Sequence, residues 1–224
     1  MRQYAMCNEY TSPRGGLGPL RPQSVRLEHE VARGDIKYEF RLASTAEERE
    51  GVWRLNHETF SRELGQHELA PDGLLVDRYA ATTRYLCAFA AGRVVGMIAV
   101  NAEPPFSIEK RLPLGVASLA DWPARRLEVR LLAIEPAHRN SMVLAGLLGS
   151  MIELAAAEGF EAILISGVVN RLAMYRRLGF RELGPPVPDG AAAFVPMAMR
   201  IGELPEHVRT GIRRWRARGG SLLP

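Results

Sequence analysis

The chain of 224 residues contains no run of about 18 apolar residues, so its sequence offers no membrane-spanning helix. Its N-terminus lacks the apolar stretch of a secretory signal. The two cysteines form no CxxC pair, so no disulfide framework is expected and both thiols should be reduced in a cytoplasm. The five histidines show no HxxxH or HxxE spacing, and we predict no metal site. These absences indicate a cytoplasmic protein without an integral membrane segment.

The chain is mildly basic, with a net charge of +4 and a pI of about 9.4, and this charge limits the partners it can bind. The arginines concentrate after Glu206, where no acidic residue follows. A basic tail can favour nucleic acid, anionic lipid or an acidic protein, and the alternative is a solvated helix face. A binding module for nucleic acid therefore remains an alternative function, although our preferred interpretation includes no nucleic acid.

Residues 1–35 hold several prolines and glycines and show no sustained period, so we expect an extension that is poorly ordered or draped over the core. Residues 36–224 are expected to form a single domain with a basic C-terminal helix. Alternating or apolar segments predict strands at 36–43, 84–90, 93–101, 126–134, 161–166, 180–183 and 192–201. Helical spacing and caps predict helices at 45–64, 107–111, 144–155, 170–178 and from 205 onward.

The strand–helix–strand unit from 126 to 166 predicts one parallel pair inside a mixed sheet. Thr45 and Glu48 have the spacing of a capping box at the start of the first helix. Asn170 can cap the helix that follows the parallel pair, and Gly179 can end it. The predicted class is α/β (α+β), a mixed central sheet flanked by helices.

The segment NRLAMYRRLGF, from Asn170 to Phe180, follows that unit and resembles the corresponding helix of the GNAT superfamily of N-acyltransferases. The resemblance implies a GNAT-like fold, an acyl thioester donor, and a hydroxyl of Tyr175 that protonates the leaving thiolate. Asn170 is then assigned to substrate binding. The alternative is that Tyr175 is a packed aromatic on an amphipathic helix.

The segment RLEVRLLAI resembles the central strand of the same superfamily, and alternation puts Glu128 and Arg130 on one face. An amino acceptor arrives mostly as ammonium, and a carboxylate can take its proton directly or through water. Glu128 is the predicted base, and its alternative role is an ion pair with Arg130 or Arg84. Arg130, Leu131 and Leu132 are assigned to substrate binding.

The turn after this strand departs from the GNAT pattern. Members that bind coenzyme A have glycines there, whose bare amides hold the pyrophosphate. Here Met142 and Leu144 occupy the glycine positions. A phosphopantetheine arm on an acyl carrier protein needs no pyrophosphate cradle, and carrier proteins are acidic. We therefore predict carrier-protein contacts at four arginines near the entry of the arm: Arg139, Arg171, Arg176 and Arg177.

Further segments narrow the resemblance. VWRLNHETFSRELG and DRYAATTRYL resemble acyl-homoserine-lactone synthases, but the tryptophan expected after Gly65 is replaced by Gln66. The EPPFSIEKRLPL loop, the EPAHRN turn and MYRRLGF resemble long-chain N-acyl amino acid synthases of the N-acyltyrosine-forming kind across about 36–215. This implies transfer of a long-chain acyl group from acyl carrier protein to a free amino acid, tyrosine or similar, with no tightly bound cofactor. The alternatives are an acyl-CoA-dependent acyltransferase and a lactone synthase that uses S-adenosylmethionine.

Three further assignments concern the binding of the substrates. His57 can bind the acceptor carboxylate or serve as an alternative base, although a lone helical histidine is more often structural. Asp77 and Arg84 can hold the ammonium and carboxylate of the amino acid, or form a surface salt bridge. Phe106 heads a group of apolar residues that can line an acyl tunnel or be ordinary core: Phe106, Ile108, Leu112, Leu114 and Trp122.

Overall fold

The structure is a computed structural model that describes residues 29–33, 36–139, 142–190 and 192–217. Within these residues one nine-stranded sheet has the order β1-β2-β3-β4-β5-β6-β9-β7, and β8 pairs with β9. Its strands are β1 (His29–Arg33), β2 (Ile36–Leu42), β3 (Thr83–Ala90), β4 (Arg93–Asn101), β5 (Arg126–Ile134), β6 (Ala162–Val168), β7 (Arg181–Glu182), β8 (Val187–Asp189) and β9 (Ala192–Arg200). Only β5 and β6 are parallel among the described pairs, so the predicted mixed sheet is confirmed.

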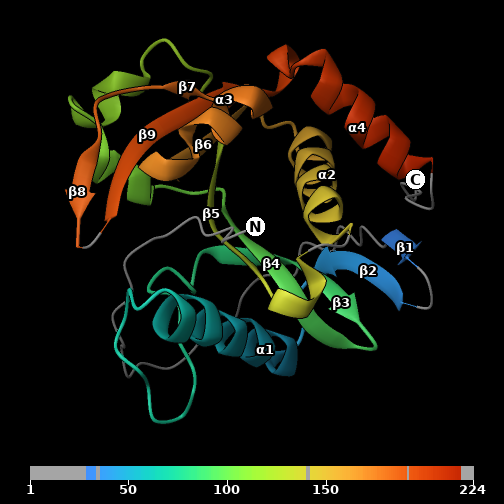
Figure 1. Cartoon of the computed structure of the whole chain (residues 1–224). Helices are drawn as coiled ribbons and strands as arrows, with labels where there is room; N and C mark the ends of the chain where they lie inside the picture. The colour runs from blue at the N-terminus through green and yellow to red at the C-terminus, as the bar shows by residue number, and fades with distance from the viewer. Residues whose placement is uncertain (1–28, 34–35, 140–141, 191, 218–224) are drawn as a thin grey trace.

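Helices cover both faces of this sheet (Figure 1). On one face, here called the η2 face, α1 (Ala46–Asn56) continues as a π-helix, η1 (His57–Glu63), and packs on β3 to β5. The same face carries two 3₁₀ helices against β6 and β9, η2 (Ser107–Arg111) and η3 (Gly115–Leu119). The opposite face, the α2 face, carries α2 (Val143–Ala157) and α3 (Leu172–Leu178), and α4 (Glu206–Arg216) packs on α2. Single 3₁₀ turns are η4 (Pro136–His138), η5 (Val169–Arg171) and η6 (Ile201–Glu203).

Local sequence signals account for several of these elements. Thr45 and Glu48 form the predicted capping box, in which the Glu48 amide donates to Thr45 Oγ1 at 3.1 Å. Ala91 and Gly92 both have positive φ, 48° and 76°, as a tight hairpin turn between β3 and β4 requires. Gly179 ends α3 with φ 102°, in the left-handed region that glycine tolerates.

The sequence did not predict three features of the fold. The strand β1 pairs antiparallel with β2, and β8 pairs antiparallel with β9. The first helix was expected to be regular up to residue 64, whereas its second half is the π-helix η1. The rest of the expected N-terminal extension, 1–28 and 34–35, lies outside the described residues.

The strand β5 carries an irregularity that positions the site. Its pairing with β4 shifts register between Met97 and Ala99, and Leu131 adopts a positive φ of 50°. As a result, Arg130 and Leu131 both lie on the η2 face, whereas Leu132 packs in the core of the α2 face. Pairing between β5 and β6 runs from Arg126 to Val129 and does not continue beyond the bulge. We call this point of separation the β5–β6 divergence.

The helix α4 is held on the α2 face by a buried aromatic anchor. Trp215 is 2% exposed and packs edge-to-face on Phe40, with ring centroids 5.9 Å apart. Gly146 and Gly149 of α2 make room for these rings, because a Cβ at Gly146 would lie 2.1 Å from Phe40 Cζ. Arg216 forms an ion pair with Glu153 of α2. The predicted C-terminal helix is therefore a packed part of the domain, and its Arg209, Arg213 and Arg214 are exposed.

Candidate active site

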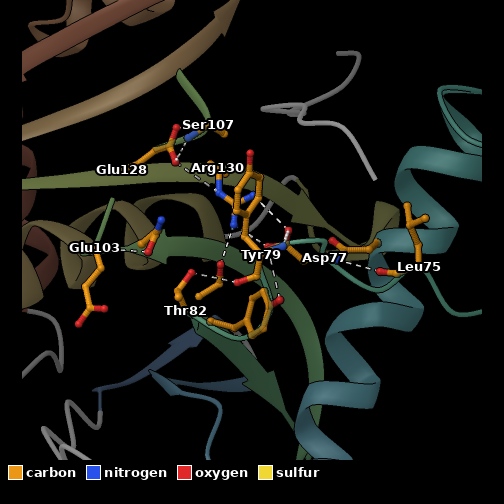
Figure 2. A network of polar contacts seen from close by, with 12 residues as sticks. Leu75, Asp77, Tyr79, Thr82, Glu103, Ser107, Glu128 and Arg130 are labelled. Atoms are coloured by element: carbon orange, nitrogen blue, oxygen red, sulfur yellow. Dashed lines mark hydrogen bonds and ion pairs between the residues drawn. The ribbon is translucent and has the colours of Figure 1, made fainter. Parts of the chain in front are cut away.

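A buried ion pair joins Asp77 and Arg130 on the η2 face (Figure 2). Arg130 Nη1 donates to Asp77 Oδ1 at 3.1 Å, and Nη2 donates to Oδ2 at 2.6 Å. Nη2 also donates to Thr83 Oγ1 at 2.6 Å, and the guanidinium lies 4.5 Å from the centroid of the Tyr79 ring. Both charged residues are at most 3% exposed, so the bidentate geometry has to offset their desolvation. The structure thus brings together two predicted substrate-binding residues.

Glu128 lies beside this pair and is 1% exposed, with 3.8 Å between its Oε2 and Arg130 Nε. It accepts three hydrogen bonds from the first turn of η2: from the Ser107 amide at 2.9 Å, the Ser107 hydroxyl at 2.7 Å and the Ile108 amide at 2.7 Å. Burial raises the pKa of Glu128, and Arg130 and these donors offset part of that rise. The carboxylate is thus the anchor of η2 as well as the predicted base.

His57 begins the π-helix η1 and is 1% exposed. Its Nε2 accepts a hydrogen bond from the Ala70 amide at 3.1 Å, which places the ring proton of a neutral imidazole on Nδ1. Nδ1 lies 3.7 Å from Glu58 Oε1. The ring nitrogen that could accept a proton is therefore occupied by a backbone amide, which favours a structural role for this histidine.

Arg84 points to the opposite face of the sheet, because it alternates with Thr83 and Tyr85 on β3. Its two terminal nitrogens each lie 2.6 Å from a carboxylate oxygen of Glu158, at the end of α2. The predicted joint site of Asp77 and Arg84 is therefore not formed. Asp77 pairs with Arg130 instead.

Tyr175 lies on the α2 face, 2% exposed, with its ring against Gly167 of β6. A Cβ at Gly167 would lie 2.9 Å from Tyr175 Cδ2, so the glycine permits this approach. The ring lines a small apolar cavity of about 30 Å³ at the β5–β6 divergence. The other lining residues come from β5, β6, α2 and α3, and from Phe180 after α3: Val129, Leu132, Leu144, Leu148, Met151, Ile165, Met174, Leu178 and Phe180. The predicted pair Leu131 and Leu132 is thus divided between the two faces.

Asn170 does not cap α3 as predicted. It is exposed within the 3₁₀ turn η5, and α3 begins only at Leu172, with Arg171 as its N-cap and no side-chain capping bond. The 3₁₀ turn forms because the chain leaves β6 at Val168 in an extended conformation and needs one turn to reach the helix.

The four arginines predicted to contact a carrier protein differ in their surroundings. Arg139 is bound through Nε to the Ile134 carbonyl at 2.9 Å and through Nη1 to Glu63 at 2.6 Å. Arg176 pairs with Glu182 at 2.5 Å. Within the part of the chain that the structure describes, Arg171 and Arg177 form no ion pair, and Arg177 is exposed. These two guanidiniums are the ones with no internal acid to satisfy them.

Phe106 borders a larger open cavity of about 770 Å³ near the start of β5. Its wall is mainly apolar, with Arg125 and Arg126 at one side. By contrast, Ile108 and Leu112 pack with Leu164 in a small core cluster, and Leu114 is 74% exposed. The residues predicted as one acyl tunnel are thus divided between a cavity wall, the core and the surface.

Several members of the site were not predicted from the sequence. Thr83, Tyr79 and Ser107 bind Arg130 or Glu128, yet the sequence assigned no role to them within the segments DRYAATTRYL and EPPFSIEKRLPL. Arg111, at the end of η2, is 4% exposed, and no role was assigned to it from the sequence. The sequence did contain an indication of its position, because Arg111 follows Ser107 by one turn of the expected helix 107–111 and therefore lies on the same side of it.

This arrangement defines a class. A mixed sheet with one diverging parallel pair and helices on both faces is the GNAT-like fold of solved acyltransferase structures. The family model of the N-acyl amino acid synthase FeeM matches residues 51–200, more than half of the chain. The chain belongs to this family, and it is an N-acyltransferase.

Solved structures show the same fold. FeeM, an N-acyl amino acid synthase from uncultured soil microbes, has a TM-score of 0.60 at 15% identity, over 83% of this chain and 95% of FeeM. BjaI, a CoA-dependent acyl-homoserine lactone synthase solved with SAM and isopentyl-CoA, has a TM-score of 0.63 at 20% identity, over 80% of this chain and 86% of BjaI. The acyl-homoserine lactone synthase LasI has a TM-score of 0.59 at 14% identity, over 73% and 90%. No curated protein matches the chain by sequence.

The described residues contain no helix that is long and apolar enough to cross a membrane. They also hold no group of three or more histidine, cysteine, aspartate or glutamate side chains that could bind a metal ion. Of the two cysteines, Cys87 lies in the described part and is buried, and burial raises the pKa of its thiol.

Proposed function

We propose that this N-acyltransferase moves a long-chain acyl group from an acyl carrier protein thioester to the amino group of a free amino acid, tyrosine or a similar one. The observation that carries the donor part is the apolar first turn of α2. Leu144 lines the cavity beside Tyr175, and Met142 packs on the core of the α2 face. Coenzyme A needs bare amides for its pyrophosphate at such a turn, whereas a phosphopantetheine arm presents a single phosphate.

The chemistry follows from the two faces of the sheet. The neutral amine attacks the thioester carbonyl, a C–N bond forms, and the C–S bond breaks. The Tyr175 hydroxyl gives its proton to the departing thiolate, and Glu128 takes the proton of the amine directly or through water. A thiol has an ordinary pKa near 8.5, so the acid contributes only modestly. The products are an N-acyl amino acid and the holo carrier protein, with no tightly bound cofactor.

The acyl chain has an apolar site within reach of Tyr175. The cavity at the β5–β6 divergence is small, but flexible side chains such as Met151 and Met174 line it, and methionine repacks readily. Burial of a 12-carbon chain would contribute up to roughly 9 kcal/mol before ordering costs, at about 0.8 kcal/mol per CH₂. That gain is large enough to select long chains over short ones.

A second candidate donor is acyl-CoA, which the similarity in fold to the CoA-dependent synthase BjaI favours. The test is a set of parallel reactions that contain the purified protein and a pool of amino acids. One reaction receives long-chain acyl carrier protein, one the same acyl group on coenzyme A, and one acyl carrier protein with S-adenosylmethionine. Mass spectrometry should detect N-acyl amino acids with the carrier-protein donor. Turnover with acyl-CoA alone would contradict the proposal for the donor, and a lactone would contradict the proposal for the acceptor.

A further inference from the structure

Arg111 is a buried guanidinium that the chemistry proposed above does not use. Among the described residues, arginine is buried at two positions, Arg111 and Arg130. Arg130 is held on two sides by Asp77 and Thr83, whereas Arg111 has one acidic partner, Asp189 of β8, bound through Nη2. Arg111 Nη1 is buried and has no hydrogen-bond partner among the described residues. A buried N–H of a charged group without a partner is costly, so it points to a ligand.

The surroundings of Arg111 fit an anion. Its guanidinium stacks on the Phe194 ring of β9, with the carbon Cζ 4.9 Å from the ring centroid. This stack and Asp189 fix the plane of the guanidinium, and the N–H groups of Nη1 remain to donate to a carboxylate oxygen. Asp189 is 30% exposed, so the pair reaches the surface along β8.

A second polar atom without a partner lies on the same face. Ser166 of β6 is 7% exposed, and its Oγ has no hydrogen-bond partner among the described residues. Leu164, two residues earlier, packs against η2, so alternation places Ser166 on the η2 face as well. Between Ser166 and Val168 stands Gly167, whose opposite side contacts Tyr175. The η2 face at Ser166 therefore lies directly behind the tyrosine at which the acyl group is expected.

Glu128 links Arg111 to the centre of the site. Ser107 and Ile108, which bind Glu128, occupy the first turn of η2, and Arg111 ends the same short helix. The central strand thus fixes the helix that carries Arg111.

We propose that Arg111 is the residue that binds the α-carboxylate of the acceptor amino acid, with Ser166 as a hydrogen-bonding neighbour. This inference rests on the proposed function and names the part of the acceptor that is recognised. It assigns the acceptor to the η2 face and to an arginine different from Arg84. An acceptor with a free carboxylate is then preferred over an amine that lacks one.

The test compares L-tyrosine with tyramine, which has the same ring and amine but no carboxylate. For the wild type, KM for tyramine should exceed KM for tyrosine by roughly tenfold or more, the size expected for a charge-assisted hydrogen bond. Arg111→Gln should raise KM for tyrosine by a similar factor and so remove most of the preference for tyrosine over tyramine. For Arg111→Lys, KM for tyrosine should lie between the values of the wild type and of Arg111→Gln. The control is Arg200→Gln, because Arg200 stacks on Trp122 at the same 4.9 Å on the outer end of β9.

A change of the same size for both acceptors, or an unchanged preference in Arg111→Gln, would overturn the assignment. If the variant does not fold, a binding measurement on the wild type takes its place. Calorimetry compares the affinities of N-dodecanoyl-L-tyrosine and N-dodecanoyltyramine. Tighter binding of the first, by roughly tenfold, supports a carboxylate site, and equal binding rejects it. This binding measurement does not depend on turnover. If no amino acid is acylated by any donor, the proposed function fails, and the calorimetry still decides whether a carboxylate site exists.

Discussion

At the scale of single residues, the hydroxyl of Tyr175 is the proposed general acid. Tyr175→Phe keeps the ring against Gly167 and removes only the hydroxyl. We expect kcat to fall about 100-fold, the lower end of general acid catalysis, because a thiolate is a good leaving group. KM for the acyl donor should not change, since the packing remains. Steady-state kinetics measure both constants.

The matched control is Tyr38→Phe, which removes a buried hydroxyl bonded to His138 at 2.8 Å. It should leave kcat within about twofold of the wild type, since Tyr38 lies on β2, away from the β5–β6 divergence. Equal rates for the wild type and Tyr175→Phe would leave Tyr175 with a packing role alone.

The second prediction at this scale concerns the pH dependence of the rate. Burial raises the pKa of Glu128, and a base acts only when it is deprotonated. Activity should therefore rise with pH through a pKa above the ordinary value of a glutamate, and the acidic limb of kcat should lie at correspondingly higher pH. Glu128→Gln should abolish this limb together with most of the rate. An acidic limb that persists in the variant would assign it to another group.

At the scale of elements, the close approach of α2 to the sheet depends on Gly146. A Cβ there would lie 2.1 Å from Phe40 Cζ, and Phe40 in turn supports Trp215 of α4. Gly146→Ala should therefore lower the free energy of unfolding by about 1–3 kcal/mol through overpacking. The control is Gly211→Ala in α4, where a Cβ meets no atom within 4 Å. This variant should raise the free energy of unfolding by about 0.5–1 kcal/mol. Urea denaturation with both variants measures the difference, and equal stabilities would contradict this account of α2.

The helices, turns and strands also differ in how well the sequence predicts them. The capping box at Thr45, the turn at Ala91 and the helix end at Gly179 were predictable because each depends on residues close in the chain. The strands β1 and β8 depend on partners elsewhere and have little pattern of their own. The bulge at Leu131 has no sequence signal, since leucine is disfavoured at positive φ and the surrounding core holds it there.

The candidate site was predictable only in part for a similar reason. Alternation along β5 correctly placed Glu128 and Arg130 on one face. The same rule applied to β3 puts Arg84 opposite Tyr85, which separates it from Asp77. The contact of Arg111 with Phe194 and Asp189 required the sheet order, in which β9 lies beside β6. Spacing along the chain carries no information about that neighbour.

At the scale of the whole molecule, the prediction concerns the docking of an acidic carrier protein. Arg171 and Arg177 flank Tyr175 and form no ion pair within the described residues. The double reversal Arg171→Glu and Arg177→Glu should weaken binding of acyl carrier protein by roughly tenfold or more at low salt, and the difference should shrink as salt rises. Surface plasmon resonance at several salt concentrations measures this. The control is the reversal of Arg213 and Arg214 on α4, and an effect confined to that pair would move the docking surface to α4.

The separation of β5 from β6 has a consequence for the order of events during turnover. Under the proposed function, the acyl donor reaches this point from the α2 face and the acceptor from the η2 face, so neither has to depart before the other arrives. Catalysis should then proceed through a ternary complex without a covalent acyl-enzyme. Double-reciprocal plots at several fixed donor concentrations should intersect, whereas parallel lines would indicate a ping-pong mechanism with one shared entrance.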